Sequence, residues 1–281
     1  MDSPTKRLIL SVIAKLYDPM GWLSPVVIVA KRLMQQLWLQ KLQWDEPVPT
    51  DLEDYWSKYY KRLTQLQAIQ IPRWTGQGAD NLGCELHGFS DASSRSYAAI
   101  VYLRIIQEDG SARVTLLIAK TRVAPILPVT IPRLELCGAQ LLAKTLHFLI
   151  STMGFESIPL YCHTDASVVL AWLTKHPSTW RTFVSNRVAH IHELVPNAKW
   201  RYVPTKENPA DCASRGLFPE ELKDHPLWWH GSQWLTKHSA SSPESRSVLS
   251  QDMDLEWSKK VTYHTMKQAK QPFDLADRFS S

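Results

Sequence analysis

Four acidic residues stand where the sequence predicts the end of a strand or the start of a helix. They are Asp91, Glu135, Asp165 and Asp211. Asp91 and Asp165 each close a predicted strand, whereas Glu135 and Asp211 each follow a proline that opens a predicted helix. The carboxyl ends of parallel strands and the N-termini of helices form one rim of an α/β sheet, where ligands usually bind. We therefore expect the four carboxylates to lie on one rim.

Carboxylates gathered in this way predict a metal site. Four of them on one rim cannot all stay ionised without cations, and oxygen ligands select hard ions, chiefly magnesium or manganese. Two such ions about 4 Å apart suit phosphodiester cleavage, because one activates a water and the other stabilises the leaving oxygen. The sequence thus predicts Asp91, Glu135, Asp165 and Asp211 as catalytic residues that hold two ions.

Each acid also has a purely structural interpretation. Asp91 and Asp211 stand in contexts typical of helix or turn caps, and Glu135, in the first turn of a predicted helix, could simply interact with the helix dipole. The metal-site hypothesis depends on all four acids appearing in order on the expected elements.

The elements that must position these acids form an α/β pattern. Strands are predicted at 84–90, 97–106, 113–123, 159–164 and 199–203. The first three are joined by short links and predict an antiparallel meander, with an Asp-Gly turn at 109–110. Helices separate the first, fourth and fifth strands, which should therefore be parallel. We predict a five-stranded mixed sheet flanked by helices, preceded by a helical segment.

Composition sets wider bounds on the protein. The 281 residues fit one ordinary domain with flanking segments, and 44% of them are hydrophobic, enough for a packed core. The net charge of +5 is compatible with a polyanionic partner but does not single one out. Four scattered cysteines indicate reduced thiols and an intracellular protein, cytoplasmic or nuclear. No apolar run approaches the roughly 20 residues that span a membrane.

Several ordered motifs resemble the ribonuclease H domain of retrotransposon polyproteins, most closely the Pao (or BEL) group. Those in the sheet region are Phe89-Ser90-Asp91-Ala92-Ser93, Ile131-Pro132-Arg133-Leu134-Glu135-Leu136, His163-Thr164-Asp165-Ala166-Ser167 and the segment 203–215 with Asn208-Pro209-Ala210-Asp211. Upstream, residues 14–25 and 44–47 resemble the segment that joins reverse transcriptase to ribonuclease H in that group. The similarity covers roughly residues 6–236.

This resemblance implies a ribonuclease H-like fold in which the four acids bind the metal ions. It also implies an RNA–DNA hybrid or other nucleic acid as the partner, and association with the rest of a reverse transcriptase polyprotein. The protein would sense the 2′-hydroxyls of one strand and the phosphates of the other. We predict substrate contacts from Ser93, Ser94, Arg95, Arg133 and Lys206.

The predicted organisation has four parts. They are a helical connection-like segment at 1–66, a ribonuclease H-like domain at 67–218, an aromatic extension at 219–237 and a flexible tail at 238–281. Basic residues between 112 and 144 could follow a phosphate backbone or guard an exposed sheet edge. These residues are Arg113, Lys120, Arg122, Arg133 and Lys144.

The sequence departs from the resembling family in three respects. The loop before Asp211 carries no histidine, whereas many relatives have a mobile one there. No Tyr-x-Asp-Asp motif and no integrase-type zinc set occur, so the chain should neither polymerise nor integrate. The chain is therefore expected to be a piece of a polyprotein or a gene derived from an element.

Two other functions remain open. One is a vestigial nucleic-acid-binding module that keeps the fold without turnover. The other is an aspartic peptidase, a label sometimes given to this family, for which Asp91-Ala92-Ser93 and Asp165-Ala166-Ser167 form a suggestive pair. Retroviral-type proteases need Gly at the third position of that motif, so the pattern favours the nuclease.

Overall fold

A five-stranded mixed sheet lies at the centre of the fold, with strand order β3-β2-β1-β4-β5. This computed structural model describes residues 3–78, 80–237 and 256–257. β1 pairs antiparallel with β2 and parallel with β4, and β5 pairs parallel with β4. The predicted sheet is therefore confirmed. The strands are β1 (Gly83–Ala92), β2 (Ser96–Ile106), β3 (Ala112–Val123), β4 (Leu160–Thr164) and β5 (Lys199–Tyr202).

Helices cover both faces of this sheet, as predicted. Before the sheet lie α1 (Lys6–Ala14), α2 (Ser24–Leu39), α3 (Thr50–Arg62) and a 3-10 helix, Leu63–Ala68. The sheet region adds α4 (Ile131–Met153), α5 (Ser167–Leu173), α6 (Thr182–Leu194) and α7 (Ala210–Arg215). The aromatic extension forms α8 (Pro219–Lys223), α9 (Pro226–His230) and a 3-10 helix, Gln233–Thr236. No helix of the described ranges is long and apolar enough to cross a membrane.

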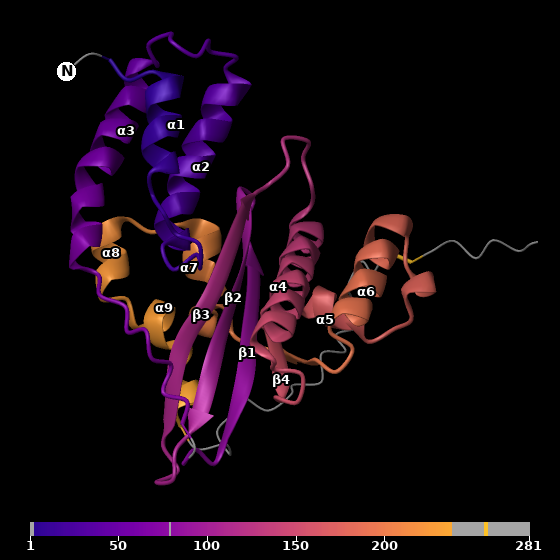
Figure 1. The fold of residues 1–281 in the computed structure, drawn as a ribbon. Coiled ribbons are helices and arrows are strands. Elements are labelled where there is room, and N and C mark those ends of the chain that lie inside the picture. Colours follow the sequence, from indigo (N-terminus) through magenta and orange to yellow (C-terminus); the bar gives the residue numbers. More distant parts are fainter. Residues whose placement is uncertain (1–2, 79, 238–255, 258–281) are drawn as a thin grey trace, which may run out of the picture.

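The sheet separates two apolar cores, because successive side chains of a strand point to opposite faces. Along β2, Ala98, Ile100 and Tyr102 pack with α1–α3 and α7–α9. The intervening Ala99 and Val101 pack with α4–α6 on the other face. Figure 1 shows these two helical layers on either side of the sheet.

The N-terminal helices share a core with the sheet. α2 buries residues along most of its length, including Val26, Ile28 and Leu33, and each fully buried aliphatic side chain stabilises the fold by about 1.5–3 kcal/mol. The turn before α2 also bonds to the edge strand, since the Ala119 N–H donates to the Met20 carbonyl at 2.8 Å. The predicted boundary near residue 66 therefore separates segments that pack against one another.

The turn before α2 requires glycine, which gives a stability prediction. Gly21 has φ +74°, and a Cβ there would lie 1.8 Å from the Ala119 carbonyl oxygen. Gly21→Ala should therefore lower the free energy of unfolding by about 2–5 kcal/mol, from backbone strain and overpacking together. Gly154→Ala is a matched control, because Gly154 has φ +69° but open space around it. Its cost should be only roughly 1–2 kcal/mol. Equal losses in denaturant titrations would contradict the described packing of this turn on β3.

The predicted tail lies almost wholly outside the described residues. Its two described residues, Glu256 and Trp257, contact the domain. The Trp257 ring lies 4.9 Å from the Trp180 ring, and the Arg181 N–H donates to the Glu256 carbonyl at 3.0 Å.

Candidate metal centre

Two of the predicted acids lie side by side because their strands are parallel neighbours. β1 and β4 are in register from Leu86–Leu160 to Ser90–Thr164. Asp91 directly follows Ser90, and Asp165 directly follows Thr164. Both carboxylates therefore lie at the same edge of the sheet. This is the rim expected from the sequence.

Glu135 reaches that rim from α4. It is the fifth residue of α4, one turn before Gly138, rather than a first-turn residue as predicted, because the helix begins one residue early. A Cβ on Gly138 would lie 3.1 Å from the Asp91 carbonyl oxygen, so the missing side chain lets the helix pack closely on β1. The Ala92 N–H then donates to the Glu135 carboxylate.

The structure brings Asp91, Glu135 and Asp165 into one cluster. A carboxylate oxygen from each lies within 4.8 Å of the other two. Asp91 and Glu135 are 3% and 7% exposed, whereas Asp165 is half-buried. The cluster therefore combines two nearly dry carboxylates with one that water can reach.

The cluster strongly disfavours ionisation when no cation is bound. Burial, and then the nearby charges of Asp165 and Asp211, raise the pKa of Asp91 to about 7 despite a hydrogen bond from Ser214. Burial and the charges of Asp91 and Asp165 raise the pKa of Glu135 to about 9. A divalent cation would remove this penalty, because an opposite charge favours the ionised carboxylates.

The cluster also fits a hard cation chemically. Glu135 Oε2 is buried and has no hydrogen-bond partner among the described residues, and a buried carboxylate oxygen is costly to leave unsatisfied. Carboxylate oxygens are the ligands that magnesium and manganese prefer. The buried acidic triad is therefore consistent with divalent-metal binding.

Asp211 lies outside the triad. Its carboxylate accepts a hydrogen bond from Arg215 Nε at 2.5 Å, one helical turn away in α7. Its charge nevertheless contributes to the raised pKa of Asp91 and Glu135, so it lies near the cluster. Its role as a fourth ligand stays a prediction.

Three side chains that were not predicted as site residues position the triad. Thr205 Oγ1 donates to Asp165 Oδ2 at 2.6 Å, and Ser214 Oγ donates to Asp91 Oδ2. Asn208 Nδ2 donates to the Ser90 carbonyl at 3.0 Å, which ties the loop before α7 to the end of β1. The position of Thr205 and Asn208 just before Asp211 is the signal that could have revealed them.

The five predicted substrate contacts differ in exposure and in the hydrogen bonds they already make. Ser94, Arg95 and Lys206 are exposed. Ser93 Oγ is engaged within the protein, because it donates to the Ser214 carbonyl at 2.9 Å. Arg133 Nε donates to Glu256 Oε1 at 2.6 Å, so its guanidinium is already paired with a carboxylate of the same chain. All five stay predicted contacts.

The histidines of the helix that precedes the Asp211 loop do not replace the missing loop histidine. His190 and His192 belong to α6, where they are within hydrogen-bond distance of Gln140 Nε2 and of the Leu173 carbonyl, respectively. Both interactions are internal to the domain.

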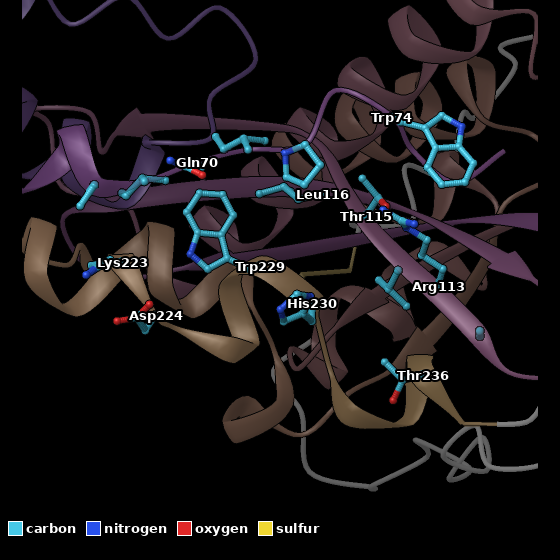
Figure 2. A pocket seen from close by; sticks show the side chains of 16 residues that line it. Gln70, Trp74, Arg113, Thr115, Leu116, Lys223, Asp224, Trp229, His230 and Thr236 are labelled. Carbon is cyan, nitrogen blue, oxygen red and sulfur yellow. The ribbon is translucent and has the colours of Figure 1, made fainter.

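A separate cavity of about 640 Å³ lies between β3 and the α8–α9 region. Trp74, Arg113, Trp229 and His230 are among the side chains that line it (Figure 2). None of the four predicted acids lines this cavity, so it is not part of the candidate metal centre.

The chain was compared with models of known protein families and with curated protein sequences. Residues 5–166, which are 162 of the 281 residues, match the family model of the Pao retrotransposon-like RNaseH-like domain. This match contains the whole triad and ends before Asp211. No curated protein sequence matches the chain.

Solved structures with some likeness include ribonuclease H domains. The N-terminal RNase H domain of a Mycobacterium tuberculosis protein is 15% identical over 47% of this chain and 94% of that chain, with a TM-score of 0.35. LC11-RNase H1 in complex with an RNA/DNA hybrid is 15% identical over 46% of this chain and 91% of that chain, with a TM-score of 0.32. The foamy viral protease-reverse transcriptase in complex with RNA/DNA hybrid is 13% identical over 60% of this chain and 26% of that chain, with a TM-score of 0.26. Because these TM-scores are low, the likeness adds nothing to the family match and the sheet topology.

Proposed function

The chain belongs to the family of Pao retrotransposon-like RNaseH-like domains, and from this premise we propose that it cuts the RNA strand of an RNA–DNA hybrid by metal-dependent hydrolysis. The observation that carries the proposal is the convergence of Asp91, Glu135 and Asp165, whose carboxylate oxygens lie within 4.8 Å of one another. Three acids from β1, α4 and the end of β4 need a cation to remain ionised together.

The residues of the chain hold and orient the reacting groups. When bound, magnesium or manganese would activate a water and stabilise the leaving oxygen of the phosphodiester. Asp91, Glu135 and Asp165 would hold two ions, with Asp211 as a further ligand at the edge. Thr205 and Ser214 fix the carboxylates of Asp165 and Asp91, so the ligands are oriented before the ions arrive.

Substrate contacts are proposed at the exposed rim. Ser94, Arg95 and Lys206 are free to meet a sugar-phosphate backbone, and Ser93 lies in the same turn as Ser94 and Arg95. Arg133 would have to exchange its Glu256 partner for a phosphate. Hydroxyl contacts to the 2′-OH would let the protein distinguish RNA from DNA. We further propose that the chain works together with other parts of a reverse transcriptase polyprotein.

The triad favours a nuclease over an aspartic peptidase. A peptidase dyad consists of two carboxylates that share a proton, and Asp91 and Asp165 could be such a pair. Here a third carboxylate, Glu135, lies within 4.8 Å of both. A third acid suits a multi-ion site, in which each carboxylate binds a cation.

A hybrid-cleavage assay tests the proposal. With magnesium or manganese, the purified protein should cut an end-labelled RNA strand paired to DNA and leave duplex DNA intact, and a chelator should abolish the cutting. The missing loop histidine predicts modest turnover, so long incubations at high enzyme concentration are appropriate.

Other outcomes of this assay would replace the proposal. Hybrid binding without cleavage in either metal would identify a vestigial binding module. Cleavage that persists in chelator would place the chemistry away from the triad. Metal-independent cleavage of a peptide library at acidic pH would identify the peptidase.

A further inference from the structure

One arginine of the N-terminal helical segment contacts the rim that carries the triad. Arg32 lies on α2 and is partly buried. Its Nη1 donates to the Arg215 carbonyl at 2.5 Å, and its Nη2 donates to the Ser214 carbonyl. Its Nε donates to Ser96 Oγ at 3.2 Å, at the start of β2. The planar guanidinium thus joins the end of α7 to the sheet.

The Ser214 carbonyl is the point where these contacts converge. Besides Arg32 Nη2, it accepts hydrogen bonds from Ser93 Oγ at 2.9 Å and from Ser96 Oγ at 2.5 Å. Carbonyls in the last turn of a helix lack helical partners, so side-chain donors are needed to satisfy them. These donors fix the C-terminal end of the short helix α7.

The same serine contacts the metal centre through its side chain. Ser214 is fully buried, and its Oγ donates to Asp91 Oδ2. α2 holds the following residues as well, because the Leu217 N–H donates to the Pro25 carbonyl at 3.0 Å. A Cβ on Gly216 would lie 2.8 Å from Val29 Cγ2, so α7 and α2 are in close contact there. The path from α2 to Asp91 is therefore a short series of direct contacts.

We propose that Arg32 is a positioning residue of the metal centre, which orients the Asp91 carboxylate through Ser214, and that α2 is thereby part of the active site. This inference rests on the proposed nuclease function. Arg32 holds the Ser214 backbone, and a fixed backbone keeps the Ser214 hydroxyl aimed at Asp91. Because the guanidinium fork satisfies acceptors in fixed directions, a lysine ammonium cannot reproduce the arrangement.

The effect of Arg32 is geometric rather than electrostatic. The charged groups that most shift the pKa of Asp91 are Asp165, Asp211 and Arg215, and the connection from Arg32 to Asp91 consists of the hydrogen bonds made by Ser214. Partners that orient metal ligands typically change metal affinity or activity by about 10–100-fold. We therefore expect loss of Arg32 to weaken the response to magnesium and to leave hybrid binding unchanged.

Steady-state cleavage at varied magnesium tests this inference in the full chain. Arg32→Met, Arg32→Lys and Ser214→Ala should each raise the magnesium concentration for half-maximal cleavage, or lower kcat, by about 10-fold or more, with the KM for hybrid unchanged. The double variant Arg32→Met/Ser214→Ala should be no worse than the single variants, because both act through one path. Lys31→Met, which removes a cation from the exposed neighbouring position, should match the wild type.

The opposite results would overturn it. An active Arg32→Lys enzyme with normal magnesium response would show that charge suffices, and multiplying losses in the double variant would show separate roles. A lower Tm with an unchanged kcat and an unchanged magnesium requirement per folded molecule would make Arg32 a purely structural residue. If the wild type does not cleave hybrid, the proposed function fails first. The magnesium-induced rise in Tm then remains as a readout, and it should be smaller in Arg32→Met than in Lys31→Met.

Discussion

Replacing Asp165 by asparagine should reduce hybrid cleavage by about 100-fold or more while the fold stays intact. Removal even of partners that merely orient metal ligands costs about 10–100-fold, and Asp165 is a proposed ligand. The amide keeps the volume of the side chain but removes a charge that the cations need. Thr205 Oγ1, which donates to Asp165 Oδ2 at 2.6 Å, can still donate to the amide oxygen. Single-turnover cleavage, with circular dichroism on the same samples, measures both effects.

A matched control separates the loss of the ligand from a general effect of charge. Asp54→Asn makes the same chemical change at an exposed position on α3, and it should leave cleavage at the wild-type rate. Wild-type activity in Asp165→Asn would remove this residue from the site. Equal losses in both variants would point to protein quality or net charge instead of the metal centre.

Raising the pH in the presence of chelator should destabilise the protein. Asp91 and Glu135 have pKa values of about 7 and about 9 in the folded protein, whereas unfolded carboxyls have a pKa near 4. Between these limits the folded state binds more protons than the unfolded state, so the free energy of unfolding falls as pH rises. Because water and buffer cations enter as the site ionises, we expect a fall on the order of 3 kcal/mol between about pH 5 and pH 9.

Two changes should remove most of this fall in stability. Glu135→Gln replaces the group whose pKa is raised furthest and should stabilise the metal-free protein at pH 9. Magnesium should do the same for the wild type, because it pairs with the ionised carboxylates. Glu193→Gln, at an exposed position on α6, should keep the wild-type slope. Urea titrations at pH 5, 7 and 9 measure these differences, and a slope unaffected by Glu135→Gln would contradict the described burial of the triad.

Local patterns in the sequence were sufficient to predict the strands of the sheet and their relative directions. Strand periodicity, the Asp-Gly turn and the prolines before helices act over a few residues, so they can be read without knowing the fold. The right-handed crossover rule then made β1, β4 and β5 parallel. That arrangement places Asp91 beside Asp165, as the structure shows.

The triad could be predicted for the same reason. Each acid stands at a strand end or near a helix start, and these positions share one rim in any sheet of this order. The exact position of Glu135 within α4 was harder to predict from the sequence, because it depends on the helix beginning at Ile131. It also depends on Gly138, which lets α4 approach β1 closely.

Only the tertiary structure decided how the rim is held. Arg32 and Ser214 are far apart in the sequence, and nothing in the amphipathic pattern of α2 marks one arginine among its polar residues. Their contact exists because α2 and α7 pack on the same face of the sheet. Likewise, Arg133 was predicted as a substrate contact, but its hydrogen bond to Glu256 joins residues that are 123 positions apart in the sequence. Periodicity and capping report local conformation, whereas such contacts are set by the packing of distant segments.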